Sequence, residues 1–297
     1  MPGTTPTYPN PSIPIPNDFP PQHQDAQPGF TEQMRPKPMT DNPQYCAAGK
    51  LMNRAAIVTG GDSGIGQAVA IAFAKEGADV AIAFLQETND AYETKSAVEA
   101  YGRRCILLPC DLKNHTAANA VVGETMRAFG HIDILVNNIA VHYPKNSIEE
   151  ITPEQLGITF STNVLSYFHM VKAAMPHLHA GASIINTTSV AAYKGKETLI
   201  DYSATKGAVV SFTRSLALSL APKGIRVNSV APGPVWTPLI PSSFSPQEVE
   251  QFGKDTPLGR AAQPFELAPT YVYLASDDSG YVTGQVLHVN GGTITES

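Results

Sequence analysis

Tyr202 and Lys206 carry side chains that can move a proton, and they stand four positions apart in the sequence. On a helix this spacing places both side chains on one face. A free tyrosine titrates near pKa ~10 and is a poor base at neutral pH, but a neighbouring ammonium favours the phenolate. We expect Lys206 to lower the pKa of Tyr202 and make it a general acid and base. The same spacing also occurs on helices by chance, so the spacing alone does not identify a catalytic pair.

Ser189 lies just beyond an apolar run at residues 182–188 that is typical of a strand. In an open α/β sheet, ligands bind at the carboxyl ends of the strands. A hydroxyl there can hydrogen-bond a substrate oxygen and stabilise developing alkoxide charge. The alternative is that Ser189 only caps the end of the strand.

A glycine-rich loop, TGGDSGIG at residues 59–66, follows the first apolar run and precedes a helical stretch. Glycine permits positive φ in a tight turn and lets the backbone approach a pyrophosphate. The helix N-terminus then offers free N–H groups to the anion. The strand before the loop and the helix after it are the setting that distinguishes a phosphate loop from an ordinary turn. Its glycines, Gly60, Gly64 and Gly66, give the spacing G-x-x-x-G-x-G.

Seven short apolar runs alternate with amphipathic stretches along the chain. The elements they form must position the glycine loop and the candidate catalytic residues. The runs span residues 55–59, 78–84, 105–109, 132–138, 182–188, 225–232 and 285–291, and helical stretches include 64–76, 114–129, 153–179 and 202–222. Strands alternating with helices indicate βαβ units. We therefore predict one α/β domain, a doubly wound Rossmann fold with a mostly parallel seven-stranded sheet and helices on both faces.

These features together resemble the short-chain dehydrogenase/reductase family over about residues 51–293. The resemblance rests on TGGDSGIG, CDL at 110–112, NNIA at 137–140, Ser189 with YSATK at 202–206, and APGPVWTP at 231–238. It is greatest to bacterial members with a proline-rich N-terminal extension. The family usually has Asn-Asn-Ala-Gly where this chain has Asn-Asn-Ile-Ala. The bulkier Ile139 and Ala140 are expected to narrow the space beside the cofactor.

The resemblance implies an NAD(P)-dependent oxidoreductase that transfers hydride between nicotinamide and a carbinol or carbonyl carbon. It assigns catalysis to Ser189, Tyr202 and Lys206, and a proton relay to Asn163. Asp111 would reach the adenine amine or cap the following helix, and Val235 and Thr237 would hold the carboxamide and diphosphate. The implied cofactor contacts are Gly60, Asp62, Ser63, Gly64, Ile65, Gly66, Leu85, Asp111, Leu112, Asn138, Ala140, Tyr202, Lys206, Pro232, Gly233, Val235 and Thr237.

The choice between NAD and NADP is made at the end of the second strand, where an acidic residue binds the ribose 2′-OH and a basic one accepts a 2′-phosphate. This chain has Phe84-Leu85-Gln86-Glu87 there, with no clear Asp and no Arg. Asp62 in the glycine loop would repel a 2′-phosphate, so we favour NAD. Expected substrates are a small alcohol, polyol, sugar or ketone. The alternatives are an NADPH-dependent 3-oxoacyl-thioester reductase and a dinucleotide-sensing binding protein.

Two segments flank this machinery. Residues 1–48 form a proline-rich extended arm before the catalytic domain at 49–297, and the first 43 residues hold 12 of the 25 prolines. The arm is either disordered or lies on a neighbouring subunit through Tyr8, Ile13, Ile15, Phe19 and Phe30. Residues 234–262 are expected to form a substrate lid whose Trp236 and Phe252 shape the pocket. His142 faces either substrate or solvent.

Composition excludes several classes of protein. The 297-residue, 31.6 kDa chain has a net charge of −6, which argues against nucleic-acid binding. It has neither an apolar run long enough to span a membrane nor a secretory signal. Three cysteines make no disulfide framework, and no metal site is expected. We expect a cytoplasmic enzyme and, from the resemblance, a homotetramer packed through helices 153–179 and 202–222.

Overall fold

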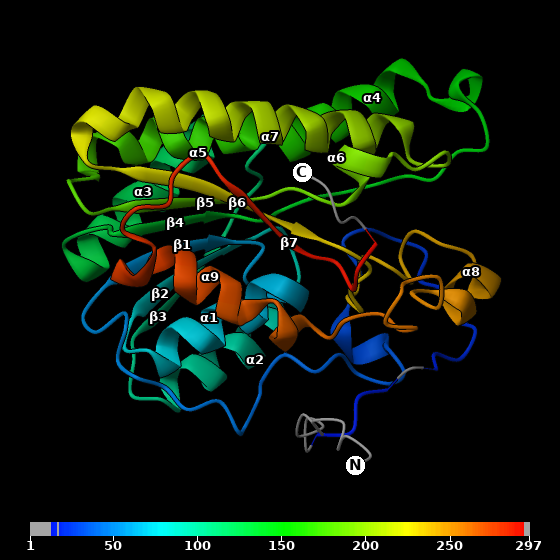
Figure 1. Ribbon diagram of the computed structural model, residues 1–297, viewed down its shortest axis with the longest axis horizontal. Coiled ribbons are helices and arrows are strands. Elements are labelled where there is room, and N and C mark those ends of the chain that lie inside the picture. Colours follow the sequence, from blue (N-terminus) through cyan, green and yellow to red (C-terminus); the bar gives the residue numbers. More distant parts are fainter. Residues whose placement is uncertain (1–12, 17, 294–297) are drawn as a thin grey trace, which may run out of the picture.

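The computed structural model describes residues 13–16 and 18–293. Their centre is a seven-stranded parallel sheet with the order β3-β2-β1-β4-β5-β6-β7 (Figure 1). The strands are β1 (Ala55–Thr59), β2 (Asp79–Phe84), β3 (Cys105–Pro109), β4 (Ile134–Asn137), β5 (Ser183–Thr187), β6 (Arg226–Pro232) and β7 (Val286–Val289). The chain reverses its direction of strand addition between β1 and β4, so the carboxyl ends of these two strands form the switch point of the fold.

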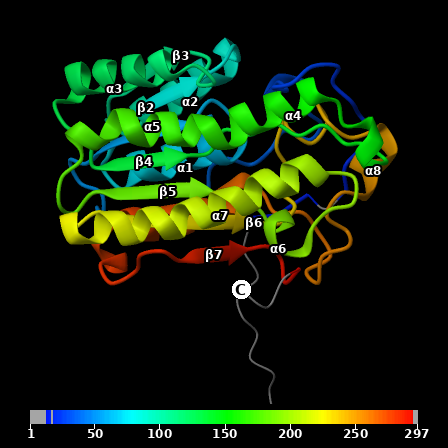
Figure 2. The same ribbon diagram turned by 90° about the horizontal axis from the view of Figure 1, so that it is seen from above.

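Helices cover both faces of the sheet, as Figures 1 and 2 show from two directions. One layer holds α1 (Gly64–Lys75), α2 (Thr88–Glu99) and α9 (Ala268–Ala275). The other holds α3 (His115–Phe129), α4 (Pro153–Phe160), α5 (Ser166–Ala174) and α7 (Ile200–Leu220). The short α6 (Ala191–Lys194) packs on α7, and α8 (Pro246–Gln251) lies apart from both layers.

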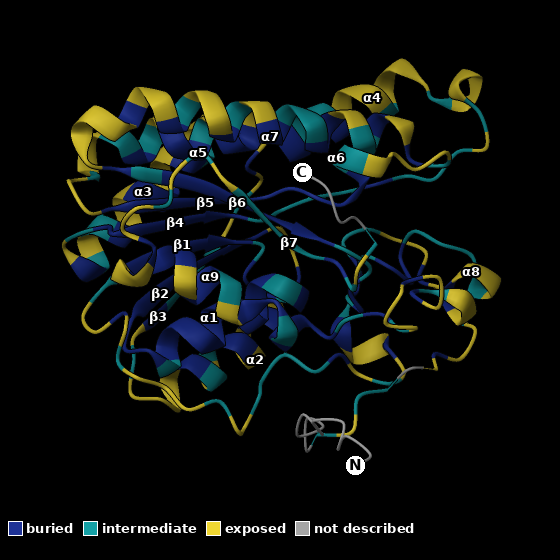
Figure 3. Ribbon diagram, in the orientation of Figure 1, coloured by how far each residue is buried: buried dark blue, intermediate teal, exposed yellow. Residues whose placement is uncertain are grey.

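The central strands are buried on both sides because each strand feeds both helical layers (Figure 3). In β1, Ile57 packs into the core under α3, α5 and α7, whereas Val58 packs into the core under α1, α2 and α9. This alternation follows from the two-residue period of a strand. It explains why the strands are continuous apolar runs in the sequence. The predicted doubly wound fold is confirmed.

The predicted helices differ from the observed ones in detail. The predicted stretch 153–179 is a continuous rod over residues 153–177, built from α4, a π-helical turn at Ser161–Leu165, α5 and a final 3-10 turn at Met175–His177. The π turn is where Asn163 is buried, and such turns are frequent at functional sites. Two further helices, α2 and α9, were not among the helical stretches expected from the sequence.

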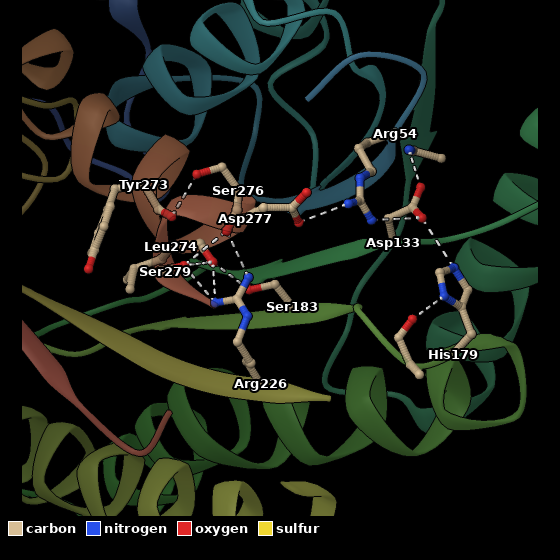
Figure 4. Close-up of polar contacts among 12 residues, drawn as sticks. Arg54, Asp133, His179, Ser183, Arg226, Tyr273, Leu274, Ser276, Asp277 and Ser279 are labelled. Atoms are coloured by element: carbon tan, nitrogen blue, oxygen red, sulfur yellow. Dashed lines mark hydrogen bonds and ion pairs between the residues drawn. The ribbon is translucent and has the colours of Figure 1, made fainter. Parts of the chain in front are cut away.

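A polar cluster ties together the amino ends of β4, β5 and β6 (Figure 4). Arg226 donates to the carbonyl oxygens of Leu274 and Ser276, at 2.9 and 3.1 Å, and to Ser279 Oγ at 2.7 Å. Asp133 accepts from the backbone N–H of Ala55 at 2.8 Å and pairs with Arg54 and His179. These contacts join α9 and the strands at the edge opposite to the glycine loop.

The arm lies on the lid of its own chain. The Phe19 ring stacks on Trp236, with centroids 3.9 Å apart, and Trp236 Nε1 donates to the Pro36 carbonyl at 2.9 Å. Phe19 and Trp236 are buried in a small separate core with Met34, Ile240, Val249 and Ala261. Tyr8 is outside the described residues. In the described part of the chain, no helix is both long and apolar enough to cross a membrane.

Candidate functional site

The glycine loop connects β1 to the N-terminus of α1 and lies at the switch point of the sheet. A Cβ on Gly66 would lie 1.8 Å from the carbonyl oxygen of Gly60, so only glycine fits there. Gly64 has φ of 51°, and a Cβ on it would meet Thr237 at 2.9 Å. The sequence therefore requires these glycines to bring the first turn of α1 close to the loop, where its N–H groups can receive an anion.

A cavity of about 330 Å³ opens beside this loop. Among the predicted cofactor residues it is lined by Gly60, Asp62, Ser63, Ile65, Leu85, Asp111, Leu112, Asn138, Ala140 and Thr237. Gly64 and Gly66 shape the loop without lining the cavity. Three arm residues, Gln27, Pro28 and Gly29, also line it, a contribution that the sequence analysis did not foresee. The glycine cradle, the helix N-terminus and this cavity fit the diphosphate and adenosine parts of a dinucleotide.

Two buried carboxyl groups, close enough for one to shift the pKa of the other, line this cavity. Asp62 and Glu87 are 4% and 1% exposed, and one oxygen of Glu87 has no hydrogen-bond partner among the described residues. Burial, with the nearby Glu87 carboxylate as a second cause, raises the pKa of Asp62 to about 7. Glu87 was missed as a site residue because it stands three positions past the strand end. The other carboxylate oxygen of Glu87 accepts a hydrogen bond from the Gln86 N–H.

The catalytic residues line a second cavity, of about 460 Å³. Ser189 follows β5, while Tyr202 and Lys206 lie on one face of α7 as their spacing predicts. Lys206 is 1% exposed, its Nζ lies 5.6 Å from the Tyr202 ring centroid, and it donates to the Thr187 carbonyl at 2.8 Å. Pro232, Gly233, Val235 and Thr237 complete the predicted set, and Asn138, Ala140, Ile65 and Thr237 line both cavities.

The pKa expected for Tyr202 differs from the one that the structure gives. Burial raises the pKa of Tyr202, and a hydrogen bond with Ser189 opposes this rise. Burial lowers the pKa of Lys206 to about 7. The expected lowering of the tyrosine pKa by Lys206 is therefore not seen in this structure, because the burial of Tyr202 is the largest cause of its shift. Burial thus moves the pKa values of the two groups apart, upward for Tyr202 and downward for Lys206.

Asp201 and Asn163 fix the surroundings of Tyr202. The buried Asp201 carboxylate accepts from the Tyr202 N–H at 2.8 Å, from Thr159 Oγ1 at 2.9 Å and from Gln155 Nε2 at 3.1 Å. It pins the first turn of α7 to α4. The sequence offered one signal for it, an acidic residue in the first turn of a helix.

Asn163 has both ends of its carboxamide engaged. Its Oδ1 accepts from the Val141 N–H at 2.8 Å, and its Nδ2 donates to the Val141 carbonyl at 2.9 Å and to Thr205 Oγ1 at 3.2 Å. The structure therefore places Asn163 as a clamp on the chain after β4. The predicted proton relay has no direct test in these contacts.

Other predicted residues take simpler places. Asn138 Nδ2 donates to the Gly60 carbonyl at 3.3 Å, and its Oδ1 accepts from Thr187 Oγ1 at 3.2 Å, so it joins β1 to β5 at their carboxyl ends. The alternative that Asp111 caps α3 is wrong, because Asn114 is the cap and accepts from the Thr116 N–H. Ile139 lines the first cavity, and its Cγ2 would lie 3.2 Å from a Cβ on Gly60.

The residues around the substrate cavity differ from two of the expectations. Trp236 does not line the substrate cavity; it is fully buried against Phe19, because the arm covers it. Phe252 does line the cavity, together with Phe244. His142 is 4% exposed and lines the same cavity, so the solvent-facing alternative for it is wrong. Within residues 13–16 and 18–293, no group of three or more His, Cys, Asp or Glu could hold a metal ion.

Comparisons with known proteins agree with this geometry. A family model described as enoyl-(acyl carrier protein) reductase matches residues 60–294. An uncharacterised oxidoreductase, YhxC of Bacillus subtilis, is 58% identical over 93% of this chain and 96% of its own. A glucose and ribitol dehydrogenase of Daucus carota is 51% identical over 93% and 97%, and an NADPH-dependent aldehyde reductase of Arabidopsis thaliana is 50% identical over 93% and 98%. These matches extend into the proline-rich arm.

Solved structures match a shorter part of the chain. A Burkholderia cenocepacia short-chain dehydrogenase in complex with NADP is 30% identical with a TM-score of 0.77, covering 82% of this chain and 98% of its own. A 3-ketoacyl-(acyl-carrier-protein) reductase of Brucella melitensis complexed with NADH is 30% identical with a TM-score of 0.75 over the same shares. Almost all of each solved chain is matched, so this chain is the longer one.

Proposed function

The chain belongs to the short-chain dehydrogenase/reductase family and is an NAD(P)-dependent oxidoreductase, and from that premise we propose how its residues carry out the reaction. The reaction moves a hydride between nicotinamide and a carbinol or carbonyl carbon of a small alcohol, polyol, sugar or ketone. The observation that carries this proposal is the cavity wall on which Ser189, Tyr202 and Lys206 meet. The bound cofactor supplies the hydride chemistry.

Each catalytic side chain has one role in this proposal. Tyr202 exchanges a proton with the substrate oxygen, and Ser189 orients that oxygen by a hydrogen bond. Lys206, when its amine is protonated, stabilises the phenolate that forms as Tyr202 gives up its proton. Burial lowers the pKa of Lys206 to about 7 and so restricts this charge to lower pH. Asn163 holds the backbone of Val141 through two hydrogen bonds. We propose that Asn163 also belongs to the path by which the proton leaves or reaches Tyr202.

We propose NAD as the preferred cofactor. The glycine loop would hold the diphosphate, while Val235, Thr237 and Lys206 would hold the nicotinamide end. Asp62 and Glu87 support the preference, because two buried carboxyl groups oppose a ribose 2′-phosphate and accept a 2′-hydroxyl. One relative is named as NADPH-dependent and one solved neighbour contains NADP, so the preference needs a direct measurement.

A second candidate is reduction of a 3-oxoacyl thioester with NADPH. It is favoured by the similarity to the 3-ketoacyl-(acyl-carrier-protein) reductase of Brucella melitensis, and the matching family model is likewise named for an acyl-carrier-protein substrate. Acetoacetyl-coenzyme A separates the two candidates. Reduction of this thioester with a higher kcat/KM than any small aldehyde, ketone or polyol favours the thioester activity; the opposite order favours the main proposal.

We also propose a homotetramer in the cytoplasm. Support for self-association comes from exposed apolar side chains on the rod of α4 and α5 and on α7, namely Leu156, Ile158, Leu165, Phe168 and Leu218. Contiguous exposed apolar surface marks interaction sites in soluble proteins. Light scattering after size exclusion should give about four times the 31.6 kDa chain mass. Cell fractionation tests the compartment.

Tyr202→Phe tests the mechanism. We expect kcat to fall by about 10²–10⁴-fold, since the variant keeps the ring but loses the proton-transfer group. NADH affinity, measured by fluorescence titration, should change by less than about threefold because the ring stays in place. Tyr281→Phe, at a fully exposed tyrosine, is the control. Turnover by Tyr202→Phe at the wild-type rate would overturn the proposed mechanism.

A further inference from the structure

The His142 imidazole is buried in the wall of the substrate cavity, directly beside Tyr202. Its ring centroid lies 5.2 Å from the Tyr202 ring and 5.2 Å from the Phe244 ring of the lid. The side chain lines the cavity, yet Nδ1 is shielded from solvent and has no hydrogen-bond partner among the described residues. Most buried polar atoms in proteins are hydrogen-bonded, so an unpaired one at this position requires an explanation.

The protonation state of the ring follows from its surroundings. Burial, with the nearby Lys206 as a second cause and Asp201 opposing both, lowers the pKa of His142 to about 3. The ring is therefore neutral at physiological pH and carries one N–H. A buried donor without an acceptor is rarer and more costly than a buried lone pair. This places the proton on Nε2 and leaves Nδ1 as the unpaired atom.

The backbone of His142 is held by the N-terminal arm. Gln27 Nε2 donates to the His142 carbonyl at 2.6 Å, and Gln27 Oε1 accepts from the His142 N–H at 3.3 Å. Asn163 forms the same kind of pair with Val141, the preceding residue. Two carboxamides from distant parts of the chain thus fix two consecutive residues next to Tyr202. A fixed backbone limits where the imidazole can lie.

Packing alone does not account for a histidine here. The ring is in contact with two aromatic rings, and a phenylalanine would fill such a space without burying an unpaired nitrogen. His288 also pairs with a tyrosine ring, that of Tyr193, and its ring nitrogens have no hydrogen-bond partner in the described part of the chain, but it lies outside this cavity and so serves as a matched control. A neutral imidazole in a cavity wall, with one N–H and no acceptor among the described residues, fits a ligand that brings an oxygen.

Resting on the proposed function, we propose that His142 is a substrate-specificity residue whose Nε2–H donates to a hydroxyl on a carbon next to the reacting one. The cavity then selects hydroxylated carbonyl compounds and polyols over plain aldehydes and alcohols. Gln27 is a positioning residue that acts through the backbone of His142. In this way the proline-rich arm takes part in substrate choice, although none of its described residues lines the catalytic cavity.

The test compares two aldehydes that differ only in hydroxyl groups, glyceraldehyde and propanal, reduced by the full-length enzyme with saturating NADH or NADPH, whichever supports the faster reaction. We expect His142→Phe to lower kcat/KM for glyceraldehyde by at least about tenfold and for propanal by less than about twofold. His142→Gln, whose amide can place a donor near the position of Nε2, should recover part of the loss. His288→Phe is the matched control and should leave the ratio unchanged.

The outcomes separate this inference from the function on which it rests. Two outcomes would overturn the role of His142 and leave the proposed function standing. In one, the wild type has the same kcat/KM for propanal as for glyceraldehyde. In the other, His142→Phe lowers kcat/KM equally for both aldehydes. A wild type that reduces neither these aldehydes nor any member of a ketone, sugar and polyol panel overturns the proposed function itself.

The role of Gln27 is tested by a double-mutant cycle. Gln27→Ala should lower the glyceraldehyde-to-propanal ratio of kcat/KM by about threefold or more, with NADH affinity measured in parallel because Gln27 also lines the cofactor cavity. Combined with His142→Phe, it should lower this ratio no further, because both changes remove the same interaction. Independent effects that multiply in the double variant would overturn the positioning role.

Discussion

Both ends of the parallel sheet carry polar side chains, but these side chains find different partners at the two ends. At the amino ends, Arg226, Asp133 and the serines around them all have protein partners (Figure 4). At the carboxyl ends, Glu87 Oε1 has no partner among the described residues, and the His142 ring lines a cavity without a hydrogen bond to any of them. Polar groups whose hydrogen-bond partners all lie within the protein hold its helices and strands together. Polar groups that it leaves unsatisfied in a cavity wall are the ones available to ligands.

The glycine loop is where a change at the carboxyl end should have the largest effect. In Gly66→Ala the new methyl group would collide with the Gly60 carbonyl, so the loop and the start of α1 must move apart. We expect NADH affinity to fall by more than about 100-fold, or folding to fail. Fluorescence titration measures the first and circular dichroism the second.

The matched control for this change is Gly123→Ala on α3, where an added methyl group meets no atom within 4 Å. It should stabilise the protein by about 0.5–1 kcal/mol through helix propensity and leave NADH binding intact. Normal NADH affinity in Gly66→Ala would show that the loop does not form the tight turn described above.

Arg226→Met should produce the opposite pattern at the amino end. It removes donors from two carbonyl groups and from Ser279, so we expect a loss of about 2–4 kcal/mol in the free energy of unfolding, measured with urea. The kcat/KM of the folded protein should stay within about twofold, because no ligand group is touched. Arg127→Met, at an exposed ion pair, should cost under about 1 kcal/mol. A large fall in kcat/KM at full folding would break the distinction between the two ends.

Asp62→Asn should have the smallest effect of these changes. It tests how far the Asp62 carboxyl group in the nucleotide cavity sets the preference for NADH over NADPH. At pH 8 the wild type should bind NADH at least tenfold tighter than NADPH, about 1.4 kcal/mol. The preference should weaken as the pH falls through about 7, because Asp62 is then protonated and repels the 2′-phosphate less. In Asp62→Asn the gap at pH 8 should shrink, with the Glu87 carboxyl group still present. Tighter NADPH binding by the wild type at pH 8 would contradict the NAD preference.

The same substitution has a signature in stability. The pKa of Asp62 is raised from 3.8 to about 7 by folding, so the folded state holds the proton more tightly than the unfolded state. The wild type therefore loses stability as the pH rises from about 4 to about 7, and Asp62→Asn should remove that loss. Thermal unfolding should show a gain in Tm for the variant that grows from pH 5 to pH 8.

The sequence by itself determined the features that depend on local rules. The seven strands lie within a few residues of the apolar runs, since doubly buried strands must be apolar throughout. The glycine loop was readable because its turn tolerates no Cβ at Gly66. Tyr202 and Lys206 share a face because the helical period places residues four apart together.

Only the tertiary structure decided which side chains are buried and what they meet. Trp236 was expected in the pocket but packs on Phe19, a residue more than 200 positions away. Glu87 and His142 became site residues because segments remote in sequence enclose them, including the arm residue Gln27, which is 115 positions from His142. Burial sets pKa values and unpaired hydrogen-bonding groups, and it arises from packing between distant segments, which local sequence patterns do not encode.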